Sequence, residues 1–313
     1  MIGYRTKGES IVVLLKEGKH TFYSMVIDSY RKKYASKITN RTAEVLVENG
    51  VKRLSLLVMT HPHQDHILDM DVLIDEFCDD ESKFCSPSRS FDIDSGTVLV
   101  RECEKKILKK VRLKNIVKKS FSNQVVVIEG GYTHITSVFL YDNDDPGERE
   151  PLEIEINALT PLGPVNDANV CYKSLDPNDL SIALIICIND YYLFFGADTT
   201  NDHIEHLDPE TMTYVKFVKI PHHGSDTADR LAGYFMSNQL DYACSTTFNV
   251  GNSRLPYETV LNQYADVSKR LDVIGCASKD KRKGLYGEMT YQFKLGPTQM
   301  LTQVDSKGVT RTV

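Results

Sequence analysis

The chain lacks several features that would place it in particular classes of protein. It has no run of eighteen apolar residues, which excludes a transmembrane helix of ordinary length. Its N-terminal segment, 1–7, has no apolar signal core, so we expect a mature cytoplasmic protein. The seven cysteines are an odd number without C-x-x-C spacing, so a disulfide framework is not expected and a reducing compartment fits. Tryptophan is absent, and the sixteen tyrosines show no base-stacking cluster.

What is present fits a globular enzyme. A chain of 313 residues with 41% hydrophobic and 26% charged residues can bury a sizeable core. The net charge of −6 and the acidic loop 142–148 argue against strong non-specific binding to nucleic acid. The segment Arg101–Lys119 is the exception, with nine Lys or Arg against two Glu. Its apolar residues recur at near-helical spacing, so we predict an amphipathic helix whose basic face either follows a phosphate backbone or is simply solvated.

The strongest chemical signal is an H-x-H-x-D-H run that follows the apolar segment 54–59. It places His61, His63, Asp65 and His66, four potential metal ligands, within six residues. A strand that ends in a loop can point His61 and His63 the same way, because alternate side chains share a face. Imidazole and carboxylate ligands suit zinc first, with manganese or iron as alternatives. A surface loop that happens to be rich in histidine is the alternative interpretation.

Two later segments have the same character. The buried-strand pattern 191–195 leads into Gly196, Ala197 and Asp198, and the alternating segment 215–220 leads into Pro221-His222-His223-Gly224-Ser225. A carboxylate at a strand end is well placed to bridge two cations. We therefore expect three strand ends to converge on one metal cluster.

These motifs together resemble the metallo-β-lactamase fold superfamily, and within it the hydrolase domain of ComEC-type DNA-uptake proteins and their stand-alone relatives. The further segments that carry the resemblance are 8–14 ("GDxxll"), 25–29 ("lIDgG"), 43–51, 178–184 ("NxxSlvl"), 221–225 ("HHGS"), and the positions Ser245, Asn252 and Pro256. The likeness covers nearly the whole chain. It implies an α/β fold, an αββα four-layer sandwich of two mixed β-sheets flanked by helices. It also implies a single domain over 1–313, with a variable insertion at about 79–150.

Apolar alternation and helical periodicity predict where the elements lie. The expected strands are near 10–15, 23–28, 54–60, 153–159, 181–188, 191–196, 215–220, 241–245, 271–275 and 288–295, the last closing the sheet. The expected helices are near 41–50, 67–77, 227–236 and 257–270.

The resemblance implies a site with two divalent ions, zinc or manganese. His61 and His63 would hold one ion, Asp65 and His66 the other, with Asp198 bridging and His223 as the last ligand. The implied reaction is hydrolysis by a metal-activated water, with Asp65 also orienting the nucleophile. His222 would face the substrate as an acid or an oxyanion partner, or would only pack. Four further residues complete the expectation. Asp28 would hold a metal histidine from behind, and Ser225 would contact the substrate. Lys279 and Arg282 would neutralise a substrate phosphate or would only form an exposed turn.

Two departures from the family pattern bear on this site. The segment 177–181 has no histidine where many members supply a third-strand ligand, so Asp179, Asn178 or a displaced His134 would have to replace it, unless water completes the site. The segment Arg254-Leu255-Pro256 stands where the branch often has a histidine before the proline, so one possible substrate-binding side chain is absent. The leading hypothesis is a phosphodiesterase that acts as a nuclease on DNA or RNA, with activity that a protein partner can gate. The alternatives are a small-molecule esterase of the phosphorylcholine-esterase or lactonase kind, and a non-catalytic partner-binding module.

Overall fold

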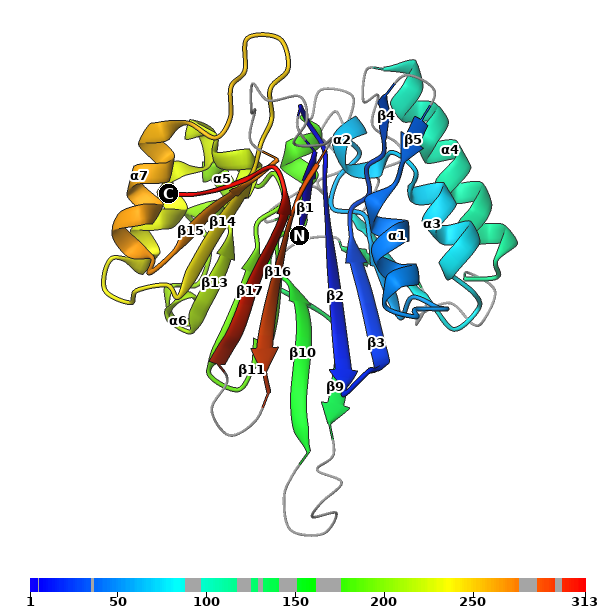
Figure 1. Ribbon diagram of the computed structural model, residues 1–313, viewed down its shortest axis with the longest axis horizontal. Helices are drawn as coiled ribbons and strands as arrows, with labels where there is room; N and C mark the ends of the chain where they lie inside the picture. The colour runs from blue at the N-terminus through cyan, green and yellow to red at the C-terminus, as the bar shows by residue number, and fades with distance from the viewer. Residues whose placement is uncertain are drawn as a thin grey trace, which may run out of the picture.

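Two eight-stranded sheets pack face to face, and helices cover both outer surfaces (Figure 1). The computed structural model describes residues 1–4, 6–34, 37–87, 97–116, 125–128, 132–140, 151–161, 176–275, 286–295 and 300–313. The strand orders are β17-β16-β1-β2-β3-β6-β7-β8 and β18-β15-β14-β13-β12-β11-β10-β9. Each sheet mixes parallel and antiparallel neighbours; β2 and β3 are antiparallel, for example, whereas β3 and β6 are parallel. The predicted αββα sandwich is therefore confirmed.

The first sheet is built from the two ends of the chain. Its strands are β1 (Ile2–Tyr4), β2 (Glu9–Glu17), β3 (His20–Ile27), β6 (Leu56–Val58), β7 (Lys83–Pro87), β8 (Val125–Ile128), β16 (Tyr286–Lys294) and β17 (Met300–Gly308). Helices α1 (Arg41–Glu48), α3 (Met70–Phe77) and α4 (Val98–Leu113) cover its outer face, and α2 (Gln64–Ile67) lies near the upper ends of its strands (Figure 1). The short strands β4 (Lys32–Tyr34) and β5 (Lys37–Thr39) pair only with each other.

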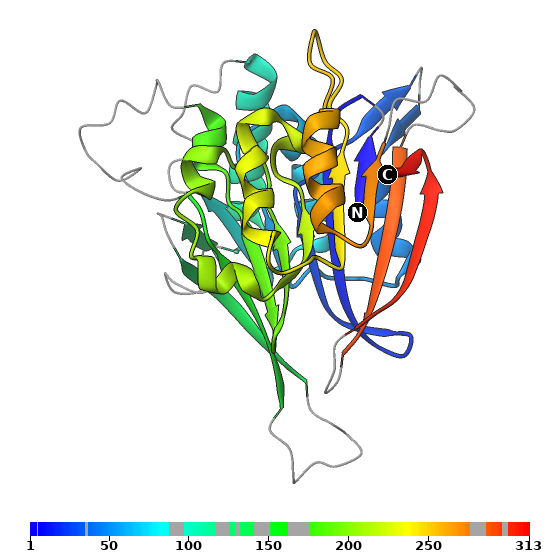
Figure 2. The same cartoon turned by 90° about the vertical axis from the view of Figure 1, so that its left-hand side faces the viewer.

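The second sheet comes from the later part of the chain. Its strands are β9 (Thr133–Leu140), β10 (Leu152–Ala158), β11 (Leu184–Ile188), β12 (Tyr191–Phe195), β13 (Val215–Lys219), β14 (Tyr242–Thr246), β15 (Leu271–Ile274) and β18 (Thr310–Thr312). Figure 2 shows its outer face, covered by α5 (Asn201–Ile204), α6 (Pro209–Thr213), the 3-10 helix η4 (Asp226–Phe235) and α7 (Glu258–Val267). Two single 3-10 turns, η2 (Pro177–Leu180) and η3 (Pro221–Gly224), connect strands.

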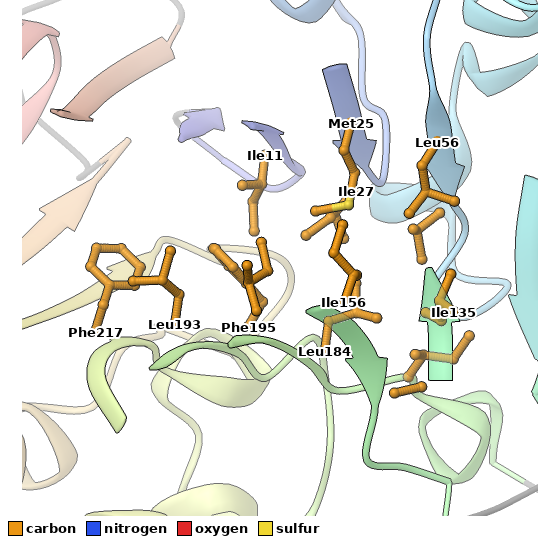
Figure 3. Close-up of a cluster of buried hydrophobic side chains, with 14 of the residues drawn as sticks. Ile11, Met25, Ile27, Leu56, Ile135, Ile156, Leu184, Leu193, Phe195 and Phe217 are labelled. Atoms are coloured by element: carbon orange, nitrogen blue, oxygen red, sulfur yellow. The ribbon is translucent and has the colours of Figure 1, made fainter. Parts of the chain in front are cut away.

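The main core lies between the sheets. Ile11 and Leu56 from the first sheet face Ile156, Leu193 and Phe195 from the second (Figure 3). In the central strands, alternate residues point to this inner core and the others pack beneath the outer helices, as the period of two requires.

Several elements differ from the sequence-based predictions. The helix expected over 67–77 begins only at Met70, as α3, because Asp69 before it adopts a left-handed φ of 70°; the separate short helix α2 precedes it. The helix expected over 227–236 is the 3-10 helix η4. The region 79–150 contributes β7, β8 and β9 to the two sheets. Finally, β16 does not close its sheet, because the largely polar edge strand β17 pairs outside it.

Among the described residues, no helix is both long and apolar enough to cross a membrane.

Candidate metal centre

Three strand ends meet at one buried cluster of histidines and aspartates. His61 and His63 follow β6, and Asp65 and His66 lie on α2 immediately afterwards. Asp198 follows β12 and His223 follows β13, the neighbouring parallel strand. The sheet topology therefore brings together residues that are up to 162 positions apart (61 to 223).

One half of the cluster joins His61, His63 and Asp198. His61 Nε2 lies 3.2 Å from His63 Nδ1 and 3.7 Å from Asp198 Oδ2. A tetrahedral zinc ion with ligands at roughly 2.0–2.1 Å separates adjacent ligand atoms by about 3.4 Å. This spacing suits His61 as a ligand, but its group of ligand atoms within 4.8 Å of one another consists of His61, His66 and Asp198. Among the described residues, no such group includes His63.

The other half joins Asp65, His66, Asp198 and His223. His66 Nε2 lies 3.5 Å from Asp198 Oδ2 and 3.8 Å from Asp65 Oδ2. His223 Nε2 lies 3.5 Å from Asp65 Oδ2 and 3.7 Å from Asp198 Oδ1. These spacings suit ligands of a second ion. Asp198 belongs to both halves, so its carboxylate has the position of a bridging ligand.

Three atoms of the cluster are buried without a hydrogen-bond partner in the described structure: His66 Nε2, His223 Nε2 and Asp198 Oδ1. Buried polar atoms are normally paired, and each unpaired one costs about 1–3 kcal/mol. A divalent cation between them would satisfy all three at once. Imidazole nitrogens with carboxylate oxygens are donors that zinc accepts and that manganese or iron tolerate. The residues present therefore fit a divalent metal.

A carboxylate holds His66 from behind. Asp28 Oδ2 lies 2.7 Å from His66 Nδ1, and Asp28 is itself buried at a left-handed φ of 60°. Its two oxygens also accept hydrogen bonds from the Thr60 backbone N–H (2.8 Å) and hydroxyl (2.7 Å). A proton on His66 Nδ1 shared with Asp28 leaves Nε2 directed into the cluster, which is the arrangement that orients metal-binding histidines.

A second supporting network was not predicted from the sequence. His223 Nδ1 lies 2.9 Å from Thr246 Oγ1, and the Thr246 hydroxyl donates to Glu9 Oε2. The other oxygen of Glu9 lies 2.7 Å from Lys219 Nζ, and this ammonium also donates to the Ala197 carbonyl (3.1 Å). Both charged side chains are buried, and Lys219 is 0% exposed. A buried ion pair thus supports His223 through one threonine.

Burial and the neighbouring charges shift the pKa values of the cluster in different directions. Burial alone would raise the pKa of Asp198, but the nearby His66 and His223 outweigh it and hold the pKa well below its ordinary value. Burial would likewise lower the pKa of His66, but the carboxylates of Asp198 and Asp28 outweigh it and raise that pKa. Burial, helped by the neighbouring His66, lowers the pKa of His61 and keeps that ring neutral.

His222 and Ser225 lie at the turn that carries His223. Both histidines of this turn have left-handed backbones, with φ of 46° at His222 and 52° at His223, a conformation that is strained for residues other than glycine. His222 is half-buried, its Nδ1 lies 2.8 Å from Thr227 Oγ1, and burial lowers its pKa. The Ser225 hydroxyl accepts from the Thr227 N–H as the N-cap of η4, so capping occupies it.

The structure does not bring every predicted site residue into the cluster. His134 is exposed on β9, where its Nδ1 lies 2.9 Å from Asn157 Oδ1. Asp179 turns its side chain back to the Asp176 N–H (3.1 Å). Neither residue joins the groups whose ligand atoms lie within 4.8 Å of one another in the described chain. Lys279 and Arg282 lie outside the described residues.

The sequence matches no protein-family model and no curated protein sequence. Among solved structures, a diphosphatase from the PhnP family is similar at 11% identity and a TM-score of 0.36, over 78% of this chain and 80% of its own. Human tRNase Z, short form, is similar at 10% identity and a TM-score of 0.34, over 86% of this chain and 90% of its own. A mutant of the CmlA beta-hydroxylase is similar at 15% identity and a TM-score of 0.34. That match covers 85% of this chain but only 41% of the hydroxylase. Scores this low carry no information about substrate.

Proposed function

We propose that the protein is a metal-dependent hydrolase that cleaves a phosphodiester, and specifically a nuclease. The observation that carries the hydrolase proposal is the convergence of His66 Nε2, His223 Nε2 and Asp198 Oδ1, all buried and without a hydrogen-bond partner among the described residues. They lie among carboxylate and imidazole atoms at the spacing of metal ligands. A fold that keeps such atoms together, and supports two of the histidines from behind, is built to hold cations.

The proposed ligands are His61, His63, Asp65, His66, Asp198 and His223, and divalent ions held by them would polarise a phosphoryl oxygen and activate a water. Asp65 contacts both His66 and His223, so its carboxylate is placed to orient the attacking nucleophile. His222 supplies a different function. The Thr227 hydroxyl donates to Ser225 Oγ (3.1 Å), so His222 Nδ1–H donates to Thr227 Oγ1. Nε2 of the neutral ring can then accept a proton from the attacking water and, once protonated, donate it to a leaving-group oxygen.

The choice of a polymeric substrate rests on α4. This helix packs against α2, which carries two of the proposed ligands, and buries Val100, Ile107 and Val111. Lys110 forms an ion pair with Asp75 (2.8 Å) on the neighbouring helix α3. The other face carries exposed cations, Lys105, Lys106, Lys109 and Arg112. A row of exposed cations on a helix that packs against α2 supports binding of a phosphate backbone.

The test is a cleavage assay with fluorescent single- and double-stranded DNA and RNA in the presence of Zn²⁺, Mn²⁺ or Mg²⁺. The proposal predicts cleavage that requires metal and is lost in the double variant Asp65→Ala/His66→Ala. Hydrolysis of bis-p-nitrophenyl phosphate without cleavage of any polymer would instead identify a small-molecule phosphodiesterase. No hydrolysis of either substrate would favour a non-catalytic or partner-activated protein.

The contribution of α4 has its own matched control. Lys105→Glu/Lys109→Glu should weaken nucleic-acid binding and flatten its dependence on salt, because fewer counterions are released. Lys52→Glu/Lys307→Glu makes the same change in net charge at exposed positions of other elements. Equal effects from the two pairs would show that only net charge matters, and would remove the support that α4 gives to a nuclease.

A further inference from the structure

The middle of the first sheet has a strand position that is only partly filled. β1 has three residues, whereas its two neighbours, β2 and β16, have nine each (Figure 1). β1 pairs with β2 at Ser10 and Glu9 and with β16 from Tyr286 to Glu288. Beyond Met1, no described strand lies between residues 11–17 of β2 and residues 290–294 of β16.

A cavity of about 970 Å³ lies at this position. Both strand edges line it, together with Leu193 and Phe195 of the second sheet and Val45 and Glu48 of α1. Leu193 and Phe195 belong to the inner core that Figure 3 shows, whereas α1 lies on the outer face. The cavity therefore passes through the thickness of the first sheet.

The backbone groups along the cavity have the pattern of two open strand edges. Met1 and Met289 exchange both of their hydrogen bonds, at 2.7 and 2.9 Å. Because bonded pairs alternate along an antiparallel ladder, the N–H and C=O of Tyr291 point to the same side as those of Met289. On the opposite edge, the Tyr4 N–H donates to the Gly8 carbonyl (3.0 Å), so the backbone of Gly8 faces β1. Every second residue along the same strand faces the same way, and the N–H and C=O of Val12 and Leu14 therefore point toward the cavity.

We propose that this cavity, the strand gap, is a docking site for one extended segment of a partner polypeptide. The segment would lie in line with β1 and pair with β2 on one side and β16 on the other. Residues 290–294 give a matching length of five residues, or about 17 Å at 3.4 Å per residue. A lipid or another apolar ligand would cover the side chains but leave both rows of backbone groups unpaired. An extended polypeptide can form hydrogen bonds with both rows of backbone groups, and we therefore infer a peptide rather than a lipid.

The alternation of β1 sets the side chains that the segment would carry. Met1 packs against the inner core, and Ile2 belongs to the outer cluster with Tyr4 and Tyr30. A segment that continues this alternation points every second residue inward, toward Phe195, and the others outward, toward α1. The partner is therefore a chain with apolar residues at every second position.

The binding test uses the peptide Thr-Val-Thr-Val-Thr, acetylated and amidated, with its two valines in the inward register. We expect saturable binding by calorimetry, and slower hydrogen exchange, by about tenfold, at the Val12, Leu14 and Tyr291 amides. The same peptide with N-methylated valines keeps its side chains but loses its hydrogen-bond donors, and it should not bind. Equal binding of the N-methylated peptide or of decanoate, with no change in exchange, would overturn a strand in favour of an apolar ligand.

Two variants and one fusion locate the effect. Leu15→Asp places a charge in the strand gap and should abolish peptide binding, whereas Val47→Asp, at an exposed position of α1 outside the cavity lining, should not. In a fusion, the same five residues are appended before Met1, so that pairing in the strand gap does not depend on a weak binding affinity. This fusion should raise the melting temperature more than a control fusion with Thr-Val-Pro-Val-Thr, because proline has no backbone N–H to donate. A gain from the fusion without any binding of the free peptide would overturn a partner and favour a strand of the same chain. No effect in either form would refute the docking site.

Discussion

The buried pair of Lys219 and Glu9 leads to the most specific prediction about stability. Two charges 2.7 Å apart attract by about 6 kcal/mol at an effective dielectric constant of roughly 20, but removing each from water costs several kcal/mol. The net value of the pair is therefore small. Losing one partner is costly, because it leaves the other charge buried. Burial would lower the pKa of Lys219, yet Glu9 and Asp198 outweigh it and raise that pKa, so the lysine is charged at neutral pH.

Replacing Lys219 by methionine keeps the length of the side chain and removes the charge. Breaking a buried pair in this way costs about 3–5 kcal/mol. Glu9 would still accept a hydrogen bond from Thr246 and would still lie 3.5 Å from His223. Because these contacts partly compensate its charge, we expect the lower end of this range, a loss of about 3 kcal/mol in the free energy of unfolding. Urea denaturation of the metal-free protein measures it.

The same strand offers a matched control. Lys216 points away from the inner core and donates to Asn238 Oδ1 (2.5 Å), so Lys216→Met should cost less than about 1 kcal/mol. A double-mutant cycle with Glu9→Gln should give a coupling energy of about 1–3 kcal/mol. Equal losses for Lys219→Met and Lys216→Met, or a coupling energy near zero, would refute the reasoning.

Three further predictions concern other residues. Burial raises the pKa of Glu104 on α4 to about 7, so the protonated carboxyl stabilises the fold at low pH, and this stability is lost as the pH rises through 7. In unfolding experiments, Glu104→Gln should therefore match the wild type at pH 4 and be more stable than the wild type at pH 8. Asp28→Asn removes the carboxylate that orients His66, so the affinity for metal should fall by about 10–100-fold, as measured by competition with a chelator. An unchanged affinity would show that Asp28 does not orient His66 for metal binding. His134→Ala should leave metal content unchanged, because the ring contacts Asn157 on the second sheet; a loss of one ion would show that His134 is a ligand.

The strand ends that form the centre were predictable from the sequence. Buried-strand patterns run directly into His61, Asp198 and His223, and the carboxyl ends of neighbouring parallel strands meet at one edge. The motif resemblance implied the arrangement of two sheets flanked by helices, which periodicity alone does not determine, but not the order of their strands.

The supporting pair was missed although the sequence carries a signal for it. Glu9 and Ile11 share a face of β2, and Phe217 and Lys219 share a face of β13, and both apolar residues lie in the inner core. A charged residue in phase with core residues on each of two strands indicates a buried ion pair. The signal does not reveal which charges meet, because that depends on how the two sheets pack.

Other features depend on tertiary context. The division between α2 and α3 follows from the left-handed φ of Asp69, and aspartate adopts that conformation without a distinct sequence pattern. β17 is an edge strand with largely polar, exposed residues, so apolar periodicity does not mark it. His134 attracted interest only because the family pattern lacked one histidine, and the register of β9 against β10 pairs it with Asn157 instead.

The most direct test of the central claim is the number of metal ions that the chain binds. The protein would be stripped with a chelator, dialysed against a small excess of Zn²⁺ or Mn²⁺, and analysed by inductively coupled plasma mass spectrometry, beside the variant His66→Ala. We predict two ions per chain in the wild type and fewer in the variant, because His66 Nε2 is one of the buried atoms without a partner in the described structure. A wild-type protein that retains no stoichiometric metal would contradict the account.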